Sequence, residues 1–542
     1  MKNIIKSLCI IVVSFSTISC MDFLTEVDPN AITVPTFWKN EDDALKGIAA
    51  AYGGLQQGFV SGSGQAGSLV RSDLARSNPW ENVQISLENF TYNETNDYIT
   101  KNWNQLYIGV FRANQVIDFV PNIKMNEDTK ATIIAEAHFL RGLYFFWLMN
   151  TFNNGSVVIP TSYPKSSEEY NLPLSSKEEV YAQIEKDFKY AAAEGALPES
   201  WETDMLGRAT WGAATGLLGK FYLYNEKWDL AAAEFKKIID RTDLYSLVPE
   251  IGWNFDIAHE WNSESLFEVN FSDVVREGFT GYNYDRTDGQ GAEATVRGLI
   301  CAPGQFGGYS VVVPTGHARE LFMSDKPDFT NPINEPGRVY SKRTEASVFF
   351  YGATYPYYHI DEEDGEKYDF NLYPSRIYIK KFQNWWDEKE DNVTQRSGIN
   401  ERILRLADVY LMYAEALVQR DGDAGAAEAM LYINKVRTRA GVLNLNYTTK
   451  DEIMKHLMYT ERPLELAYEG HAIRWNDLRR WKITKEHLGK LSKTLYHFDV
   501  LEIPDSPSFY EFKEAAKNFT DANYYLPIPN SETNSNPYIN NK

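Results

Sequence analysis

The chain has 542 residues, of which 43% are hydrophobic and 24% are charged. It is too long for one compact core and apolar enough to fold, so we expect two or three packed units or one elongated array. The formal net charge is −21, and it becomes −23 after residue 19, because Lys2 and Lys6 are the only charged residues before that point. A field of this sign repels nucleic-acid phosphates and anionic lipid headgroups. We therefore expect no nucleic-acid partner and no electrostatic docking on a membrane.

The first residues have the pattern of an export signal. Lys2 and Lys6 precede about eleven mostly apolar residues, LCIIVVSFSTI. This run is shorter than the ~20 residues that cross a membrane as a helix. The sequence therefore predicts that residues 1–19 form a signal peptide that is removed after export.

Cys20 stands directly after this segment, preceded by the small residues Thr17 and Ser19. The arrangement resembles the lipobox of bacterial lipoproteins, in which the cysteine becomes the first residue and receives fatty acyl chains, although Thr17 departs from the usual Leu. The alternative is an ordinary signal peptide with an incidental cysteine. Acyl chains in pairs or threes hold a protein firmly at a membrane, and no later run of 18 apolar residues occurs. We expect a protein that is tethered to a membrane and does not span it.

The number of cysteines also favours a lipid anchor on Cys20 over a disulfide-stabilised exported protein. After cleavage only Cys20 and Cys301 remain, so the sequence predicts no disulfide framework, although one bridge between these two is formally allowed.

Helical periodicity dominates most of the mature chain. Residues 129–150 place apolar side chains on one stripe at steps of four and three, while Glu136 and Arg141 exclude a membrane span. The Trp residues in such helical patterns are expected in the core. The stripe consists of Ile133, Ala137, Leu140, Tyr144 and Trp147; the other expected core tryptophans are Trp103, Trp211 and Trp475.

Two stretches have the pattern of helical hairpins. Residues 215–240 match the tetratricopeptide skeleton, in which small residues let two helices approach and large ones fill the groove. A second hairpin is predicted from residues 402–420 into 423–441, with Asp423 capping its second helix and Gly441 ending it. Repeats of this kind imply stacked units with a shared core. The skeleton residues are Leu218, Gly219, Tyr222, Ala231 and Phe235 in the first hairpin, and Ile403, Leu406, Tyr410, Tyr413 and Leu417 in the second.

Between residues 245 and 400 the helical periodicity fades. Gly, Pro, Tyr and Asp alternate there with short β-prone runs, SLFEVNF, SVVVP and SRIYIKKF. We expect a loop-rich insert on a helical frame, and loops held by a rigid scaffold are where ligands usually bind.

Segments along almost the whole mature chain resemble the SusD/RagB family of nutrient-uptake lipoproteins. They are SCMDFLTEVDPNAIT, FWKNEDDALKGIAAAYGGL, AEAHFLRGLYFFWLMNTF, RLADVYLMYAEAL, INKVRTRAG, ERPLELAYEGHAIRWNDLRRW and YYLPIPNSETNSNP, in that order. The resemblance implies a mainly α SusD-like fold, with tetratricopeptide-type hairpins as scaffold and a loop-rich insert with short strands as the ligand face. It also implies a carbohydrate or peptide ligand, no catalysis, and a TonB-dependent outer-membrane transporter of the SusC type as partner.

These observations divide the chain into five parts. They are a lipoprotein signal peptide (1–19), a lipidated tether (20–35), an N-terminal helical region with tetratricopeptide-type hairpins (36–244), a loop-rich ligand-binding insert (245–400), and a C-terminal helical region with a tail (401–542).

Aromatic residues in the loops are the best candidates for a glycan site. The C–H faces of a sugar ring stack on an aromatic ring, while Asp, Asn and Arg at its edge bind the hydroxyls. The adjacent pair Trp385 and Trp386 is ambiguous and is not included. The candidates are Asp73, Arg76, Asn78, Trp80, Tyr282, Tyr284, Phe306 and Tyr309.

Several motifs suggest other functions but fit them poorly. GSGQAG (62–67) has the spacing of a dinucleotide fingerprint but follows no strand, so we interpret it as a flexible loop. DEEDG (361–365) does not align with a calcium loop of the EF-hand type; we expect no cofactor, with a looser structural calcium site left open. Glu461, Glu465 and Glu469 follow one helical face and do not form the facing pair of a glycosidase, so we expect them to pair with Arg462, Arg474, Arg479 and Arg480.

The sequence as a whole predicts a lipid-anchored protein of the outer membrane that faces the cell exterior. It would bind an oligosaccharide or polysaccharide without cleaving it and deliver it to the transporter. Two alternatives remain, a peptide-binding importer component of the RagB type and a glycoside hydrolase.

Overall fold

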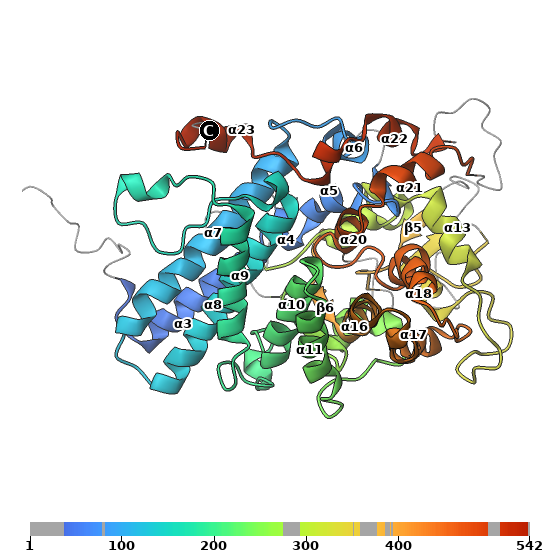
Figure 1. The fold of residues 1–542 in the computed structure, drawn as a ribbon, viewed down its shortest axis with the longest axis horizontal. Helices are drawn as coiled ribbons and strands as arrows, with labels where there is room; N and C mark the ends of the chain where they lie inside the picture. The colour runs from blue at the N-terminus through green and yellow to red at the C-terminus, as the bar shows by residue number, and fades with distance from the viewer. Residues whose placement is uncertain are drawn as a thin grey trace, which may run out of the picture.

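The computed structural model describes residues 37–77, 82–274, 293–350, 352–357, 377–384, 391, 394–496 and 510–539. Four long helices pack side by side in the first part of the chain (Figure 1). Polar caps start them; the Asn126 side chain, for example, accepts a hydrogen bond from the backbone N–H of Thr129 at the start of α8. The four helices are α3 (Glu41–Tyr52), α7 (Asp97–Phe119), α8 (Glu127–Thr151) and α9 (Lys177–Ala191).

Both predicted hairpins are present. The first joins α10 (Trp211–Tyr224) to α11 (Trp228–Ile239), and the second joins α16 (Leu406–Asp421) to α17 (Ala426–Ala440). Although far apart in sequence, α11 and α16 pack against each other, so the two hairpins stack as the repeat pattern predicts.

Two details of the second hairpin differ from the prediction. Ile403 lies in strand β6 (Glu401–Arg405), so the helix begins only at Leu406. Asp423 does not cap α17; its Oδ1 accepts a hydrogen bond from the backbone N–H of Lys450 at 2.8 Å. Gly441 does end α17, in the left-handed conformation with φ of 76° that glycine adopts without a steric penalty.

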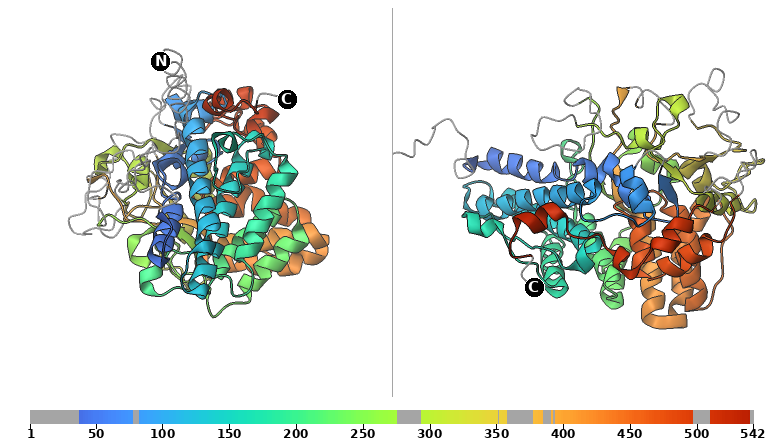
Figure 2. Two further views of the ribbon diagram at one scale, coloured as in Figure 1. Left: turned by 90° about the vertical axis from the view of Figure 1, so that its left-hand side faces the viewer. Right: turned by 90° about the horizontal axis from the view of Figure 1, so that it is seen from above.

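The β-prone runs of the insert form strands, as predicted. Each strand pairs in a two-stranded antiparallel sheet with a partner distant in sequence: β1 with β3, β2 with β6, and β4 with β5. In the right-hand view of Figure 2 the elements of the insert gather on the side opposite α16 and α17. The predicted boundaries of the five parts of the chain stay predictions. The strands are β1 (Ala75–Ser77), β2 (Ser265–Val269), β3 (Val312–Pro314), β4 (Val348–Phe350), β5 (Ile377–Ile379) and β6 (Glu401–Arg405).

Short helices complete the architecture. They connect the long helices, lie within the insert, or, near the C-terminus, lie along the upper side of the molecule in Figure 1. They are α4 (Gly58–Ser61), α5 (Ala66–Leu69), α6 (Asn82–Glu88), α12 (Arg297–Cys301), α13 (Gly316–Ser324), α14 (Lys342–Ser347), α18 (Lys450–His456), α19 (Arg462–Glu465), α20 (Ile473–Arg480), α21 (Thr484–Leu491), α22 (Lys513–Asn518) and α23 (Asn530–Ser535).

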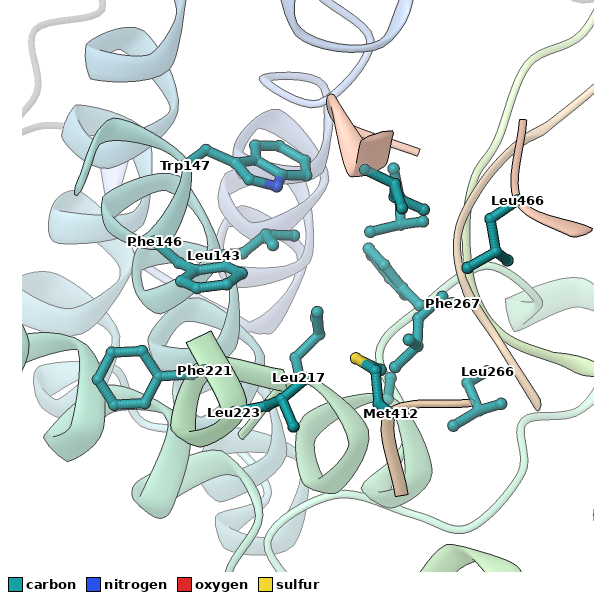
Figure 3. Close-up of a cluster of buried hydrophobic side chains, with 14 of the residues drawn as sticks. Leu143, Phe146, Trp147, Leu217, Phe221, Leu223, Leu266, Phe267, Met412 and Leu466 are labelled. Atoms are coloured by element: carbon teal, nitrogen blue, oxygen red, sulfur yellow. The ribbon is translucent and has the colours of Figure 1, made fainter. Parts of the chain in front are cut away.

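The main hydrophobic core lies where α8, α10, α16 and β2 meet (Figure 3). Phe146 of α8 packs against Phe221 of α10, and Phe267 of β2 and Met412 of α16 belong to the same cluster. Since β2 belongs to the insert and pairs with β6 at the start of α16, the core joins the insert to the helical frame.

Three of the four tryptophans expected in the core are buried. Trp103, Trp147 and Trp475 are buried, whereas Trp211 is half-buried. The prediction of a flexible loop at residues 62–67 is wrong. Gly67 is buried, and a Cβ there would lie 2.4 Å from the Tyr98 ring, so the small residue allows close packing.

Two observations bear on membrane insertion and cysteine chemistry. Within the described part of the chain, every helix is too short or too polar to span a membrane.

The Cys301 thiol is buried and not in a disulfide, and burial raises its pKa to about 12.

Candidate ligand-binding surfaces

Some of the sequence-predicted residues lie outside the described residues. They are Cys20, Asn78, Trp80, Tyr282 and Tyr284, together with the acidic segment 361–365 and the pair Trp385 and Trp386. The remaining candidates, Asp73, Arg76, Phe306 and Tyr309, are placed by the structure.

Asp73 is fully buried and is part of an ion-pair network. Its oxygens accept hydrogen bonds from Arg474, at 2.7 Å and 2.6 Å, and its Oδ2 lies 2.8 Å from Nε2 of His487. Because these partners stabilise the carboxylate, its pKa lies well below its usual range despite burial. The exposed fraction of Asp73 is 0%, so the side chain has no surface to offer a glycan. Asp73 therefore has a structural role, which corrects its assignment as a ligand contact.

The same network contains the best metal-like geometry among the described residues. Asp73, His317 and His487 each place one ligand atom within 4.8 Å of the others. Both carboxylate oxygens already bind Arg474, and a divalent cation next to that guanidinium would be repelled. The arrangement fits an ion-pair network better than a metal site.

Arg76 lies on β1 between two acidic residues and keeps part of its side chain accessible. Its Nε is 3.3 Å from Glu511, which also accepts a hydrogen bond from the backbone N–H of Gly316 at 2.7 Å. Glu88 accepts a hydrogen bond from the backbone N–H of Ser77 at 2.7 Å. Burial raises the pKa of Glu88 to about 7. The strand that leads toward residues 78–80 is thus held by two carboxyl groups.

Phe306 and Tyr309 have different environments although they are close in sequence. Phe306 is 4% exposed and stacks on Tyr357 with ring centroids 5.6 Å apart, so it belongs to a small hydrophobic cluster. Tyr309 is 38% exposed, and its hydroxyl accepts a hydrogen bond from Nε2 of Gln395 at 2.8 Å. Of the four candidates in the described residues, Tyr309 is the aromatic side chain that a ligand can reach.

The strand pairing brings two of the predicted segments together. Arg76 of β1 lies opposite Val313 of β3, and the hydroxyl of Thr315 donates a hydrogen bond to the backbone carbonyl of Asp73 at 2.7 Å. Residues 73–77 and the segment that follows Tyr309 therefore lie side by side, and most of these residues are buried.

The three carboxylates considered for glycosidase chemistry form buried ion pairs, as predicted. Their partners are not the arginines that the sequence suggested. Each is buried and ion-paired: Glu461 with Arg343 at 2.5 Å, Glu465 with Arg405 at 2.7 Å, and Glu469 with Lys381 at 2.5 Å. Arg437 and Arg439 also pair with Glu461 and Glu465, respectively. The predicted partners face elsewhere: Arg462 pairs with Asp408 and Asp477, Arg474 with Asp73, and Arg480 with Glu415, while Arg479 donates to Asn150.

A cleft that the sequence did not predict lies beside the C-terminal half of α3. Its volume is about 740 Å³. The loop that contains Met205 and Leu206 forms the opposite wall, and Asn270 and Glu293 contribute from the insert. Because segments that are distant in the sequence form the cleft, local sequence patterns do not reveal it. An indication in the sequence is that the apolar residues Leu45, Ala49 and Tyr52 extend the apolar face of α3 beyond its buried residues.

Comparison with known proteins gives the family. The model of the SusD family matches residues 263–542, and a second family model, described as starch-binding associating with outer membrane, matches residues 22–223. The chain belongs to the SusD family. This confirms the resemblance found in the sequence segments, and the mainly α fold agrees with it.

Relatives of the SusD family match over nearly their full length. SusD-like protein P25 of Formosa agariphila is 26% identical, and the match covers 97% of this chain and 95% of the relative. A SusD superfamily protein from Bacteroides vulgatus, solved by crystallography, has a TM-score of 0.73 and 25% identity over 93% of this chain and 99% of its own. Surface glycan-binding protein A from Bacteroides thetaiotaomicron, solved with laminarihexaose, has a TM-score of 0.67 at 19% identity over 92% and 98%. The last comparison concerns the fold alone.

Proposed function

We propose that this protein binds an oligosaccharide on the loops of the insert and delivers it to a TonB-dependent, SusC-like transporter in the outer membrane. The observation that carries the proposal is that family models match residues 22–223 and 263–542; a protein of similar fold, named a surface glycan-binding protein, was solved with laminarihexaose. The exposed Tyr309 supplies one aromatic face on the insert.

The proposed chemistry is capture without bond breaking. Aromatic rings remove water from the C–H faces of sugars, and polar side chains at the rim bind the hydroxyls directly or through water. These contacts involve few charges, so glycan affinity is expected to be modest and nearly independent of salt. The buried pairing of Glu461, Glu465 and Glu469 supports a role without hydrolysis.

The proposed location is the outer surface of the outer membrane, with acyl chains on Cys20 as the anchor. The description of the second matching family model, starch-binding associating with outer membrane, supports the location. Intact-mass analysis of native protein tests the anchor. We expect a mature chain that begins at an acylated Cys20, and an unmodified start or recovery from the cytosol would contradict the proposal.

The ligand class is tested on a carbohydrate array, followed by calorimetry with the glycan that binds best. Trp80→Ala and Tyr284→Ala are expected to weaken binding, and unchanged affinity in both variants would remove this site assignment. A peptide panel under the same conditions separates glycan import from RagB-like peptide import. Release of sugar products by the purified protein would favour the hydrolase alternative instead.

A further inference from the structure

The cleft beside α3 is separate in composition from the aromatic loops proposed for glycans. Leu45, Ile48 and Ala49 of α3 and Met205 and Leu206 of a second segment give it an aliphatic part, while Glu268 and Glu293 also belong to its lining. Gln56 and Asn270 hold the segments together, since Nε2 of Gln56 donates to the backbone carbonyl of Asn270 at 2.8 Å.

The lining offers little for stacking on a sugar. Tyr52 is the single aromatic residue among the described residues that line the cleft, and its hydroxyl is already engaged. It donates to Glu136 at 2.8 Å and accepts from the backbone N–H of Ala209 at 2.7 Å. An aliphatic ligand therefore fits these walls better than a glycan does.

The cations around the cleft differ in how they are paired. Lys46 lies 2.5 Å from Asp42, and Nε of Arg208 lies 2.8 Å from Glu136. Arg112, in contrast, forms no ion pair with any residue that the structure describes; it donates one N–H to the backbone carbonyl of Ala50 at 3.0 Å. The rest of its planar fork of donors is available to a carboxylate, which it can bind through two parallel hydrogen bonds.

We propose that the cleft binds a small linear aliphatic carboxylate, with its chain along the apolar wall of α3 and its headgroup on Arg112. The volume of about 740 Å³ is in the range of sites for small organic ligands. The net charge of −21 does not oppose this at physiological salt, because screening limits the field of distant charges to about 8 Å. This site is independent of the glycan function proposed above.

Calorimetry with octanoate tests the proposal on the purified protein at neutral pH and 150 mM salt. We expect octanoate to bind at least about tenfold more tightly than butyrate, since each buried methylene adds to affinity. Octyltrimethylammonium, which has the same chain and the opposite charge, is expected not to bind. Equal binding of the two octyl compounds would indicate nonspecific adsorption and would overturn the proposal.

Three variants locate the site. Ala49→Phe fills the cleft from an exposed position of α3 and is expected to abolish octanoate binding. Arg112→Gln should weaken octanoate about tenfold or more by removing a charged hydrogen-bond donor. Lys46→Gln is the matched control, because the Lys46 ammonium is already paired with Asp42. The octanoate affinity of this variant should stay within about twofold of wild type.

The variants also separate octanoate binding in the cleft from glycan binding on the insert. Ala49→Phe should keep the melting temperature and the glycan affinity of the wild-type protein while it loses octanoate. Wild-type octanoate affinity in Ala49→Phe would overturn the location of the site. Wild-type affinity in Arg112→Gln would overturn the headgroup contact.

Discussion

The guanidinium of Arg474 binds both carboxylate oxygens of Asp73, with Nε 2.7 Å from Oδ1 and Nη2 2.6 Å from Oδ2, although the two residues are 401 positions apart. Asp73 precedes strand β1, and Arg474 lies on α20. This pair, extended by His487 of α21, connects the segment before the predicted glycan loop to the C-terminal helices.

Asp73→Asn is therefore expected to destabilise the protein strongly. The substitution leaves the charge of Arg474 buried without a counterion, which typically costs about 3–5 kcal/mol. The free energy of unfolding from urea denaturation checks this. Asp42→Asn serves as the control, because its pair with Lys46 is exposed to solvent and should contribute little to stability. Equal effects of the two substitutions would show that the buried pair contributes no more than a surface pair.

Glu88 should make stability depend on pH. Burial raises its pKa from 4.5 to about 7, so between these values the folded state binds a proton that the unfolded state does not. The free energy of unfolding therefore falls as pH rises through this window. Glu88→Gln removes this contribution and still accepts the hydrogen bond of Ser77. We expect the variant to be about 3 kcal/mol more stable than wild type at pH 8 and equally stable at pH 4, since each pH unit between the two pKa values contributes about 1.4 kcal/mol.

Denaturation of both proteins at intervals between pH 4 and pH 8 measures the difference directly. Other groups titrate in this range, but they are common to the two proteins and cancel in the comparison. The same pH slope in wild type and Glu88→Gln would contradict the assignment to Glu88.

Structural elements that depend on neighbouring residues could be predicted from the sequence, whereas those that depend on residues distant in the chain could not. Both helical hairpins and strands β2, β3 and β5 were predictable, because their periodicity lies within one short segment. The start of α16 was placed too early because Ile403 fits the helical stripe, whereas pairing with β2 places it in a strand. The pattern of residues around Ile403 gives no information about its distant partner strand, β2.

The candidate site was less predictable for the same reason. Asp73 has the residue type and loop position of a sugar contact, and only its buried contact with Arg474 shows a structural role. Phe306 and Tyr309 are equally aromatic in sequence, yet tertiary packing buries one and exposes the other. The partners of Glu461, Glu465 and Glu469 also lie on other segments, so the sequence indicated pairing without identifying the pairs.

Gly219 tests the close approach of α10 and α11. A Cβ at this position would lie 2.6 Å from the Phe235 ring, so Gly219→Ala must displace a packed aromatic side chain. We expect a destabilisation of about 1–3 kcal/mol by urea denaturation, reduced somewhat by the better helix propensity of alanine.

Gly489 of α21 is the matched control for Gly219. It is also helical, but a Cβ there would meet no atom within 4 Å. Gly489→Ala should therefore stabilise the protein by about 0.5–1 kcal/mol. Equal shifts in the two variants would mean that helix propensity, and not packing against Phe235, decides the effect.

Tyr309 tests the glycan-binding surface within the described residues. Its backbone N–H donates to the carbonyl of Leu299 at 2.9 Å, and its hydroxyl binds Gln395, so the half-exposed ring is held in place. Because ring stacking contributes about 0.5–1.5 kcal/mol beyond burial, Tyr309→Ala should weaken glycan affinity about three- to tenfold by calorimetry. Tyr309→Phe keeps the ring and should retain most of the affinity. Tyr170→Ala removes an equally large ring that is 61% exposed elsewhere, and a loss as great as that of Tyr309→Ala would exclude a specific role for Tyr309.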